Sequence, residues 1–169
     1  MSLSSALLPE FDQEMAKTRT ALERVPGDKF SWKPHEKSFS FMELANHLVR
    51  LPSWGGATLK TESMDLDPVK GEFVPPPPAE TPGAVLAAFD EGVAGFRSAL
   101  EEASDEELMK PWTLLHGGEE LFTMPRLAVL RGMILNHIIH HRGQFTLYLR
   151  LNDIPVPALY GPSADEGGM

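Results

Sequence analysis

Apolar residues recur at alternating steps of three and four along most of the chain, which places them on one face of an α-helix. In the first segment, 4–25, the stripe includes Phe11, Met15 and Leu22. The turn sequence Pro26-Gly27-Asp28 follows and ends it. The pattern therefore predicts an amphipathic helix over residues 4–25.

A second helix is predicted to begin at Ser40. Ser40 and Glu43 have the spacing of a capping box, in which each side chain accepts a hydrogen bond from the other residue's backbone N–H. Leu44 and Leu48 continue the apolar stripe. We expect Pro52 to kink or interrupt this helix, because its ring clashes with the carbonyl four residues earlier. The glycines that follow it should weaken the helix further.

Two more helices are predicted in the second half of the chain. Thr81-Pro82 has the form of an N-cap followed by proline at the first helical position. The last and longest helix spans 124–152, where Gly132 and Gly143 suggest close approach by a neighbouring helix.

The connecting segments lack this periodicity. Residues 61–80 are predicted to be a loop with an extended polyproline run at 75–78, which we interpret as a spacer. Residues 111–123 should be irregular or a short hairpin around Gly117-Gly118, and 154–169 an irregular tail. With four amphipathic helices and no convincing strand series, the expected fold is all-α, a four-helix bundle in one domain, 1–169.

Charge and composition narrow the possible partners. The chain of 169 residues has 15 Lys and Arg against 24 Asp and Glu, a net charge of −9. This balance argues against nucleic acid and against an anionic membrane surface, and no apolar stretch is long enough to span a bilayer. The chain contains no cysteine. Since its first residues also lack the pattern of a signal peptide, we expect a cytoplasmic protein.

The candidate chemistry lies among the histidines of the last helix. His137 and His141 are four residues apart, so they share one helix face, and they fall between apolar residues of the stripe. We expect both to point into the bundle. Buried imidazoles need partners for their nitrogens, which a metal ion, other side chains or water would supply.

His47, on the inward edge of the second helix, would complete a set of three imidazoles. Three protein ligands with an open position are typical of a catalytic metal site. Residues 124–152 contain no carboxylate, so a divalent ion would keep its full charge and favour an anionic fourth ligand. His140 could replace His141 as a ligand, although we expect it to flank the site.

Four further residues share the helix faces of these ligands. Gln144, Tyr148 and Trp54 lie seven residues after His137, His141 and His47, respectively. Each could line the pocket or orient a ligand, but the two aromatic residues could equally be core packing. Glu43 precedes His47 by four residues, and we interpret it as a capping residue.

The run Asn136-His137-x-x-His140-His141-Arg142-Gly143-Gln144, with His47 in an Ala-Asn-His-Leu context, resembles the DinB/YfiT-like superfamily. The Pro52-x-Trp54 step and the closing Pro155-x-Pro157-Ala158-Leu159-Tyr160-Gly161 are similar too, so the resemblance covers about 38–160. It implies a bundle in up-down-down-up order and a divalent metal (nickel, zinc, iron or manganese) held by His47, His137 and His141. It also implies homodimers and, in some relatives, transferases or isomerases that use a low-molecular-weight thiol.

The sequence is compatible with three functions. The leading hypothesis is a metal-dependent S-transferase that acts on a small-molecule substrate with a low-molecular-weight thiol as co-substrate, because a protein without cysteine must take its thiol from a substrate. The second is a metal-dependent hydrolase that uses water. The third is a non-enzymatic bundle in which the metal or the histidines stabilise a dimer or a stress-response binding module.

Overall fold

The computed structural model of the chain describes residues 2–67 and 77–167, and most of them are helical. The long helices are α1 (Leu3–Leu22), α2 (Phe41–Lys60), α3 (Pro82–Glu102) and α6 (Asn136–Leu151). The short helical elements are η1 (Gly27–Lys29), α4 (Asp105–Met109), α5 (Arg126–Val129) and η2 (Leu130–Leu135). The strands are β1 (Ser63–Asp65), β2 (Pro111–His116) and β3 (Glu119–Pro125).

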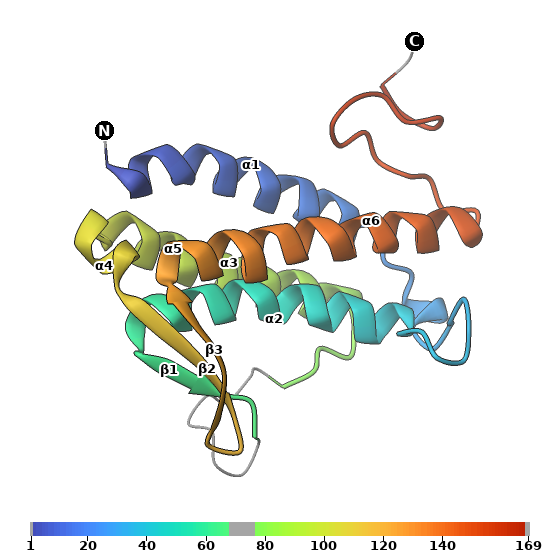
Figure 1. Cartoon of the computed structure of the whole chain (residues 1–169). Helices are drawn as coiled ribbons and strands as arrows, with labels where there is room; N and C mark the ends of the chain where they lie inside the picture. The colour runs from blue at the N-terminus through green and yellow to red at the C-terminus, as the bar shows by residue number, and fades with distance from the viewer. Residues whose placement is uncertain (1, 68–76, 168–169) are drawn as a thin grey trace.

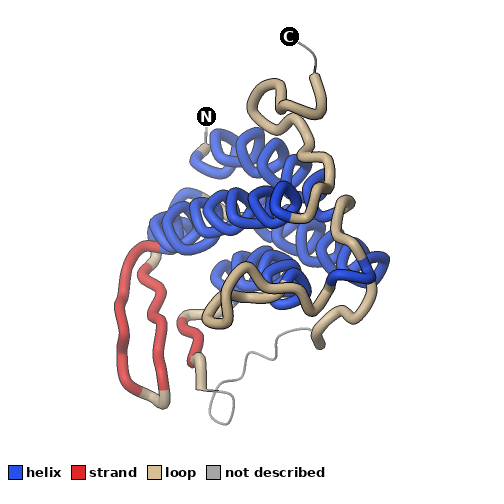
Figure 2. The backbone as a smooth tube through the Cα atoms, turned by 90° about the vertical axis from the view of Figure 1, so that its right-hand side faces the viewer, coloured by secondary structure: helices blue, strands red, loops and turns tan. Residues whose placement is uncertain are grey.

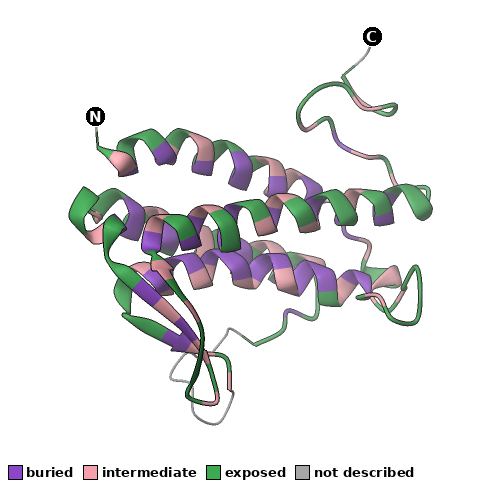
Figure 3. Ribbon diagram, in the orientation of Figure 1, coloured by how far each residue is buried: buried purple, intermediate pink, exposed green. Residues whose placement is uncertain are grey.

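The long helices lie alongside one another and enclose the main hydrophobic core (Figure 1). Their buried faces turn inward, as the colouring of Figure 3 shows. Each predicted stripe contributes to the core, for example through Phe11, Leu48, Phe96 and Phe145, which are at most 1% exposed. The aromatic rings pack edge to face, as between Phe11 and Phe96, whose centroids are 4.8 Å apart.

The predicted helix starts agree with the structure where local capping chemistry determines them. The Ser40 hydroxyl accepts the backbone N–H of Glu43, and the Glu43 carboxylate accepts that of Ser40, which completes the capping box. Thr81 caps α3, with Pro82 in its first turn. The first helix differs slightly from the predicted range of 4–25. It begins at Leu3, with Ser2 as its N-cap, and ends at Leu22.

The predicted interruption of the second helix at Pro52 is wrong. Helix α2 continues through Pro52, which is buried, to Lys60. A Cβ added at Gly55 would lie 2.3 Å from the ring of Phe96 on α3, so this glycine allows a close approach of the two helices. The small residues of α2 therefore serve packing that outweighs their poor helix propensity. Gly132 and Gly143 have no such neighbour among the described residues, so the close approach predicted there is not found.

The expectation of an all-α fold missed a small sheet. Strand β2 pairs with β1 in parallel and with β3 antiparallel, in the order β1-β2-β3 (Figure 2). The predicted alternative of a hairpin around Gly117-Gly118 is confirmed, with φ of 63° and 87° at these residues. The Asp65 carboxylate accepts both of their backbone N–H groups, at 2.9 and 2.8 Å, and so ties the turn to β1. Local propensity did not reveal this sheet, because β1 is only three residues long and its partner is distant in sequence.

The predicted last helix is divided in the structure. Residues 124 and 125 belong to β3, a π-helical turn (η2) separates α5 from α6, and the helix ends at Leu151. The tail is irregular over its described residues, 154–167, as predicted. The loop predicted over 61–80 contains strand β1, and its residues 68–76, which include the first half of the polyproline run, lie outside the described residues. Within the described ranges, no helix is long and apolar enough to cross a membrane.

Candidate metal centre

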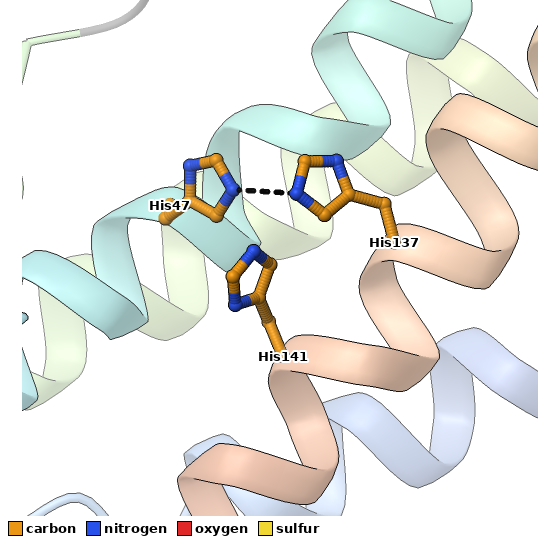
Figure 4. Close-up of side chains that lie close together, drawn as sticks. All are labelled: His47, His137 and His141. Carbon is orange, nitrogen blue, oxygen red and sulfur yellow. Dashed lines mark hydrogen bonds between the residues drawn. The ribbon is translucent and has the colours of Figure 1, made fainter.

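Three imidazoles converge between α2 and α6. His47 comes from α2, His137 and His141 come from successive turns of α6, and their rings point toward one another (Figure 4). One ring nitrogen of each residue lies within 4.8 Å of the corresponding nitrogens of the others. The Nε2 atoms of His47 and His137 are 3.2 Å apart. The structure thus brings together the three residues that the sequence grouped.

The position of the two α6 histidines relative to the core differs from the prediction. The buried stripe of α6 runs through Ile138, Arg142 and Phe145 rather than through His137 and His141. The two histidines occupy the edge of this stripe and are half-buried. They are therefore accessible to a small molecule from solvent, which a fully inward orientation would prevent.

Hydrogen bonds fix how the α6 imidazoles present their nitrogens. The Nδ1–H of His137 donates to the backbone carbonyl of Met133, 3.2 Å away. The Nδ1–H of His141 donates to the side-chain Oε1 of Gln144, at 2.7 Å. Both acceptors lack a proton, so they select the tautomer in which Nε2 carries no proton. The Nε2 of His137 can then accept a hydrogen bond from Nε2–H of His47, 3.2 Å away (Figure 4). This arrangement of ligand and outer acceptor is typical of metal-binding histidines.

The protonation equilibria also favour neutral imidazoles. Burial, followed by the charges of His141, His137 and Arg50, lowers the pKa of His47 to about 4. Burial likewise lowers the pKa of His137 and of His141, and their hydrogen bonds to Met133 and Gln144 only partly oppose it. At neutral pH all three lone pairs are therefore available, as metal binding requires.

The donor set fits a divalent metal ion. Two nitrogens that bind one tetrahedral zinc ion at about 2.0–2.1 Å lie about 3.3 Å from each other. The observed 3.2 Å between the Nε2 atoms of His47 and His137 is close to this value. No carboxylate occurs among these donors, so the ion would retain its double charge. Nickel, iron and manganese also bind imidazole, so the donor set does not select the metal.

Among the other residues that the sequence singled out, some lie at the cluster and some have a purely structural place. Gln144 belongs to the site through His141, and its Nε2 also lies 3.1 Å from Nε2 of His140, which flanks the cluster as expected. Tyr148 is core packing, although its hydroxyl donates to the carbonyl of Phe39 at 3.0 Å. Trp54 lines a small apolar pocket between α2 and the sheet. Glu43 is the capping residue that the sequence predicted.

Sequence reasoning missed two residues beside the cluster. The ring of Phe39 lies 5.7 Å from that of His47 and 6.4 Å from that of His141, measured between centroids. Phe39 and Arg50 line a cavity of about 250 Å³ that has His47 in its wall. Arg50 follows His47 by three residues on a predicted helix, so helical spacing alone could have identified it.

A buried ion pair adjoins the site on α6. Arg142, next to His141, has a side chain that is 1% exposed, and it donates to the carboxylate of Glu14 on α1 at 2.6 Å. It also donates to the Glu14 carbonyl and to Thr18. The Tyr160 hydroxyl, from the tail, donates to the same carboxylate at 2.6 Å. We call Glu14, Thr18, Arg142 and Tyr160 the buried arginine cluster.

Comparison with known structures agrees with this architecture. A DinB-like protein from Bacillus cereus superposes with a TM-score of 0.69 at 21% identity, covering 92% of this chain and 97% of the other. A DinB-like protein from Bacillus subtilis gives 0.67 at 19% identity, with coverage of 90% and 95%. A member of the DinB family from Exiguobacterium sibiricum gives 0.60 at 15%, with coverage of 93% and 97%. At these identities the likeness shows the fold alone.

Sequence comparison adds the family. No curated protein matches the chain in sequence. The family model of the DinB superfamily matches residues 10–145, which include all three clustered histidines as well as most of the helical core. By this match the chain belongs to the DinB superfamily.

Proposed function

We propose that the protein is a metal-dependent enzyme and that His47, His137 and His141 hold a divalent ion with one side open to a small-molecule substrate. The observation that carries this proposal is the convergence of three imidazole nitrogens within 4.8 Å. Three histidines with an open position are the ligand pattern of catalytic rather than structural sites.

The reaction we favour is S-transfer from a low-molecular-weight thiol. A divalent ion bound here would supply a positive charge that lowers the pKa of a thiol. In the transfer, the sulfur forms a bond to the electrophile, the leaving group departs with its electron pair, and the thiol proton passes to water. The chain contains no cysteine, so the nucleophilic sulfur has to come from the co-substrate.

The residues around the cluster support such a reaction. Met133 and Gln144 hold two imidazoles in the tautomer that exposes Nε2, so little reorganisation is needed on binding. The ring of Phe39 covers one side of His47 and His141. Tyr148 binds the Phe39 carbonyl and thereby positions this ring.

Further expectations about the fold, the location and the partners complete the proposal. The helices would follow the up-down-down-up order of the family's bundle, and the whole chain, 1–169, would act as one domain. The protein would act in the cytoplasm as a homodimer without nucleic-acid or membrane partners. The acidic net charge supports the absence of nucleic-acid and anionic membrane partners, and the exposed Leu147 and Leu151 on α6 support a dimer.

Metal content tests the core of the proposal. Tag-free protein, reconstituted separately with zinc, nickel, iron and manganese, should retain about one equivalent of at least one metal by inductively coupled plasma mass spectrometry. Alanine at His47, His137 and His141 together should abolish retention. The matched control is His140→Ala, which removes an adjacent imidazole outside the cluster and should retain the metal.

Activity assays then separate the reaction types. Consumption of an electrophile such as monochlorobimane that requires an added thiol, and that the triple-alanine variant lacks, would support S-transfer. Turnover of an ester by the metal-loaded protein without thiol would favour hydrolysis instead. If the wild-type protein retains no metal under any of these conditions, the enzymatic proposal is wrong, and a non-enzymatic bundle becomes the better explanation.

A further inference from the structure

The cavity beside His47 contains a cation that the described part of the chain leaves without a partner. The cavity has a volume of about 250 Å³, and its lining consists of Phe39, Met42, Glu43, Asn46, His47, Arg50 and Pro78. Within the described residues, Arg50 makes no hydrogen bond or ion pair, and its Nε is buried. A buried N–H without an acceptor costs free energy, so such a group calls for an explanation.

The other polar side chains of the cavity already have partners. The Glu43 carboxylate accepts the N–H of Ser40 at 2.7 Å and pairs with Lys33 at 3.2 Å. The Asn46 amide donates to the carbonyl of Ala79 at 3.0 Å and accepts the N–H of the same residue at 2.7 Å. Among the described residues that line this cavity, Arg50 is therefore the polar side chain that remains without a partner.

Arg50 and His47 are placed to act on the same small molecule. They are three residues apart on α2, so their Cβ atoms are about 5–6 Å apart on one helix face. Both residues line the same cavity, so a molecule bound in it lies beside both side chains. Phe39 lies over His47 and also lines the cavity, so the cavity and the metal centre adjoin.

We propose that Arg50 binds the carboxylate of the substrate or co-substrate, which extends from the metal centre into this cavity. The proposal rests on the proposed function, to which it adds the chemical class of the ligand: a small organic acid. A guanidinium offers parallel N–H donors that match a carboxylate, and Nε is one of them. Such a ligand would satisfy the buried Nε.

Size and charge favour a carboxylate over a phosphate. A cavity of about 250 Å³ with apolar walls formed by Phe39, Met42 and Pro78 fits a short carbon chain with one anionic end. The Glu43 carboxylate lies in the same lining and would repel a dianion more strongly than a monoanion. One arginine also matches the charge of one carboxylate.

The first experiment uses metal-free protein, so its outcome does not depend on the metal proposal. In ¹⁵N-labelled protein, the Arg50 Nε–H resonance is assigned by its absence from Arg50→Lys and titrated with propionate, propanamide or inorganic phosphate. We expect a saturable shift with propionate and none with propanamide. No shift with propionate, or a larger response to phosphate, would overturn the proposal of a carboxylate site.

The second experiment compares 3-mercaptopropionate with 3-mercaptopropanamide on cobalt-loaded protein by the change in its absorption spectrum. The wild type should bind the acid about 10-fold or more tightly than the amide, since a hydrogen bond between charged groups is worth at least that factor. Arg50→Met should bind both compounds equally. Arg50→Lys should keep a reduced preference for the acid, because it retains the positive charge but lacks the parallel N–H donors of a guanidinium.

Arg131→Met is the matched control for the loss of one positive charge, because Arg131 pairs with Glu10 and is outside this cavity. It should preserve the wild-type preference for the acid. An equal preference in wild type and Arg50→Met, with metal content unchanged, would refute the role of Arg50 and leave the metal centre intact. Loss of metal binding in the wild type would instead count against the proposed function, and the metal-free titration would still decide the role of Arg50.

Discussion

His141 and Arg142 are neighbours on α6, yet their surroundings differ in every respect that matters for function. Arg142 is buried and bonded to Glu14, Thr18 and Tyr160, so the protein itself satisfies its charge. His141 is half-buried, faces two other imidazoles, and has an acceptor on Nδ1 only. A polar group that the chain satisfies completely holds the fold together. A cluster that presents unshared lone pairs is prepared for a ligand.

Of the variants that distinguish these two regions, Arg142→Met should have the largest effect on the free energy of unfolding. Removal of one partner leaves the Glu14 carboxylate buried without its cation, which costs about 3–5 kcal/mol of unfolding free energy. Urea denaturation measures this loss. Arg131→Met, at an exposed ion pair with Glu10, should cost no more than about 1 kcal/mol. Comparable losses in the two variants would show that the buried arginine cluster has no special role.

The pH dependence of stability should report on the same cluster. Burial opposes ionisation of Glu14, but hydrogen bonds from Tyr160 and Arg142 outweigh it, and the pKa of this carboxyl is lowered. Its contribution is therefore complete above the ordinary glutamate pKa of about 4.3 and disappears as pH falls through the lower folded-state value. In urea titrations, the difference in stability between wild type and Glu14→Gln should narrow below this pH. A constant difference from pH 3 to 7 would contradict the assignment.

The contact between Gln144 and His141 should affect the metal affinity of the proposed site, and only slightly the stability. Gln144→Ala removes the acceptor for His141 Nδ1 and should weaken metal affinity about 10–100-fold. Competition with a chelator of known affinity measures it. Because Gln144 is exposed, unfolding free energy should change by less than about 0.5 kcal/mol. His140→Ala leaves the bond to His141 in place and should lower affinity far less; an equal loss would assign the effect to the His140 contact instead.

The smallest effect concerns Gly143, between Arg142 and Gln144. A Cβ here meets no described atom within 4 Å, so Gly143→Ala should raise unfolding free energy by about 0.5–1 kcal/mol without changing metal affinity. Thermal denaturation with parallel metal titration measures both quantities. Gly55→Ala is the informative counterpart, because its Cβ would collide with Phe96 and should cost about 1–3 kcal/mol. Destabilisation at both glycines would contradict the open surroundings of Gly143.

Local patterns predicted the parts of the molecule that depend on nearby residues. The capping box at Ser40, the start of α3 and the pairing of His137 with His141 follow from fixed short spacings, and His47 is added from its place on the inward edge of the second helix. The continuation of α2 through Pro52 could not be predicted, because packing against α3 decides it. The pairing of Glu14 with Arg142 spans 128 positions, and nothing in either local sequence signals it. These spacings do not identify the metal or the substrate.

The π-helical turn at Leu130–Leu135 has a consequence for the orientation of the two histidines that follow it. Such a turn holds one residue more than an α-helical turn, and one residue corresponds to a rotation of about 100° around a helix. The hairpin enters this segment before the turn and the histidines follow it. A single-residue deletion at Gly132 would thus swing the histidines away from α2 while leaving the hairpin in place. The turn thus sets the angle between the hairpin and the three-histidine cluster.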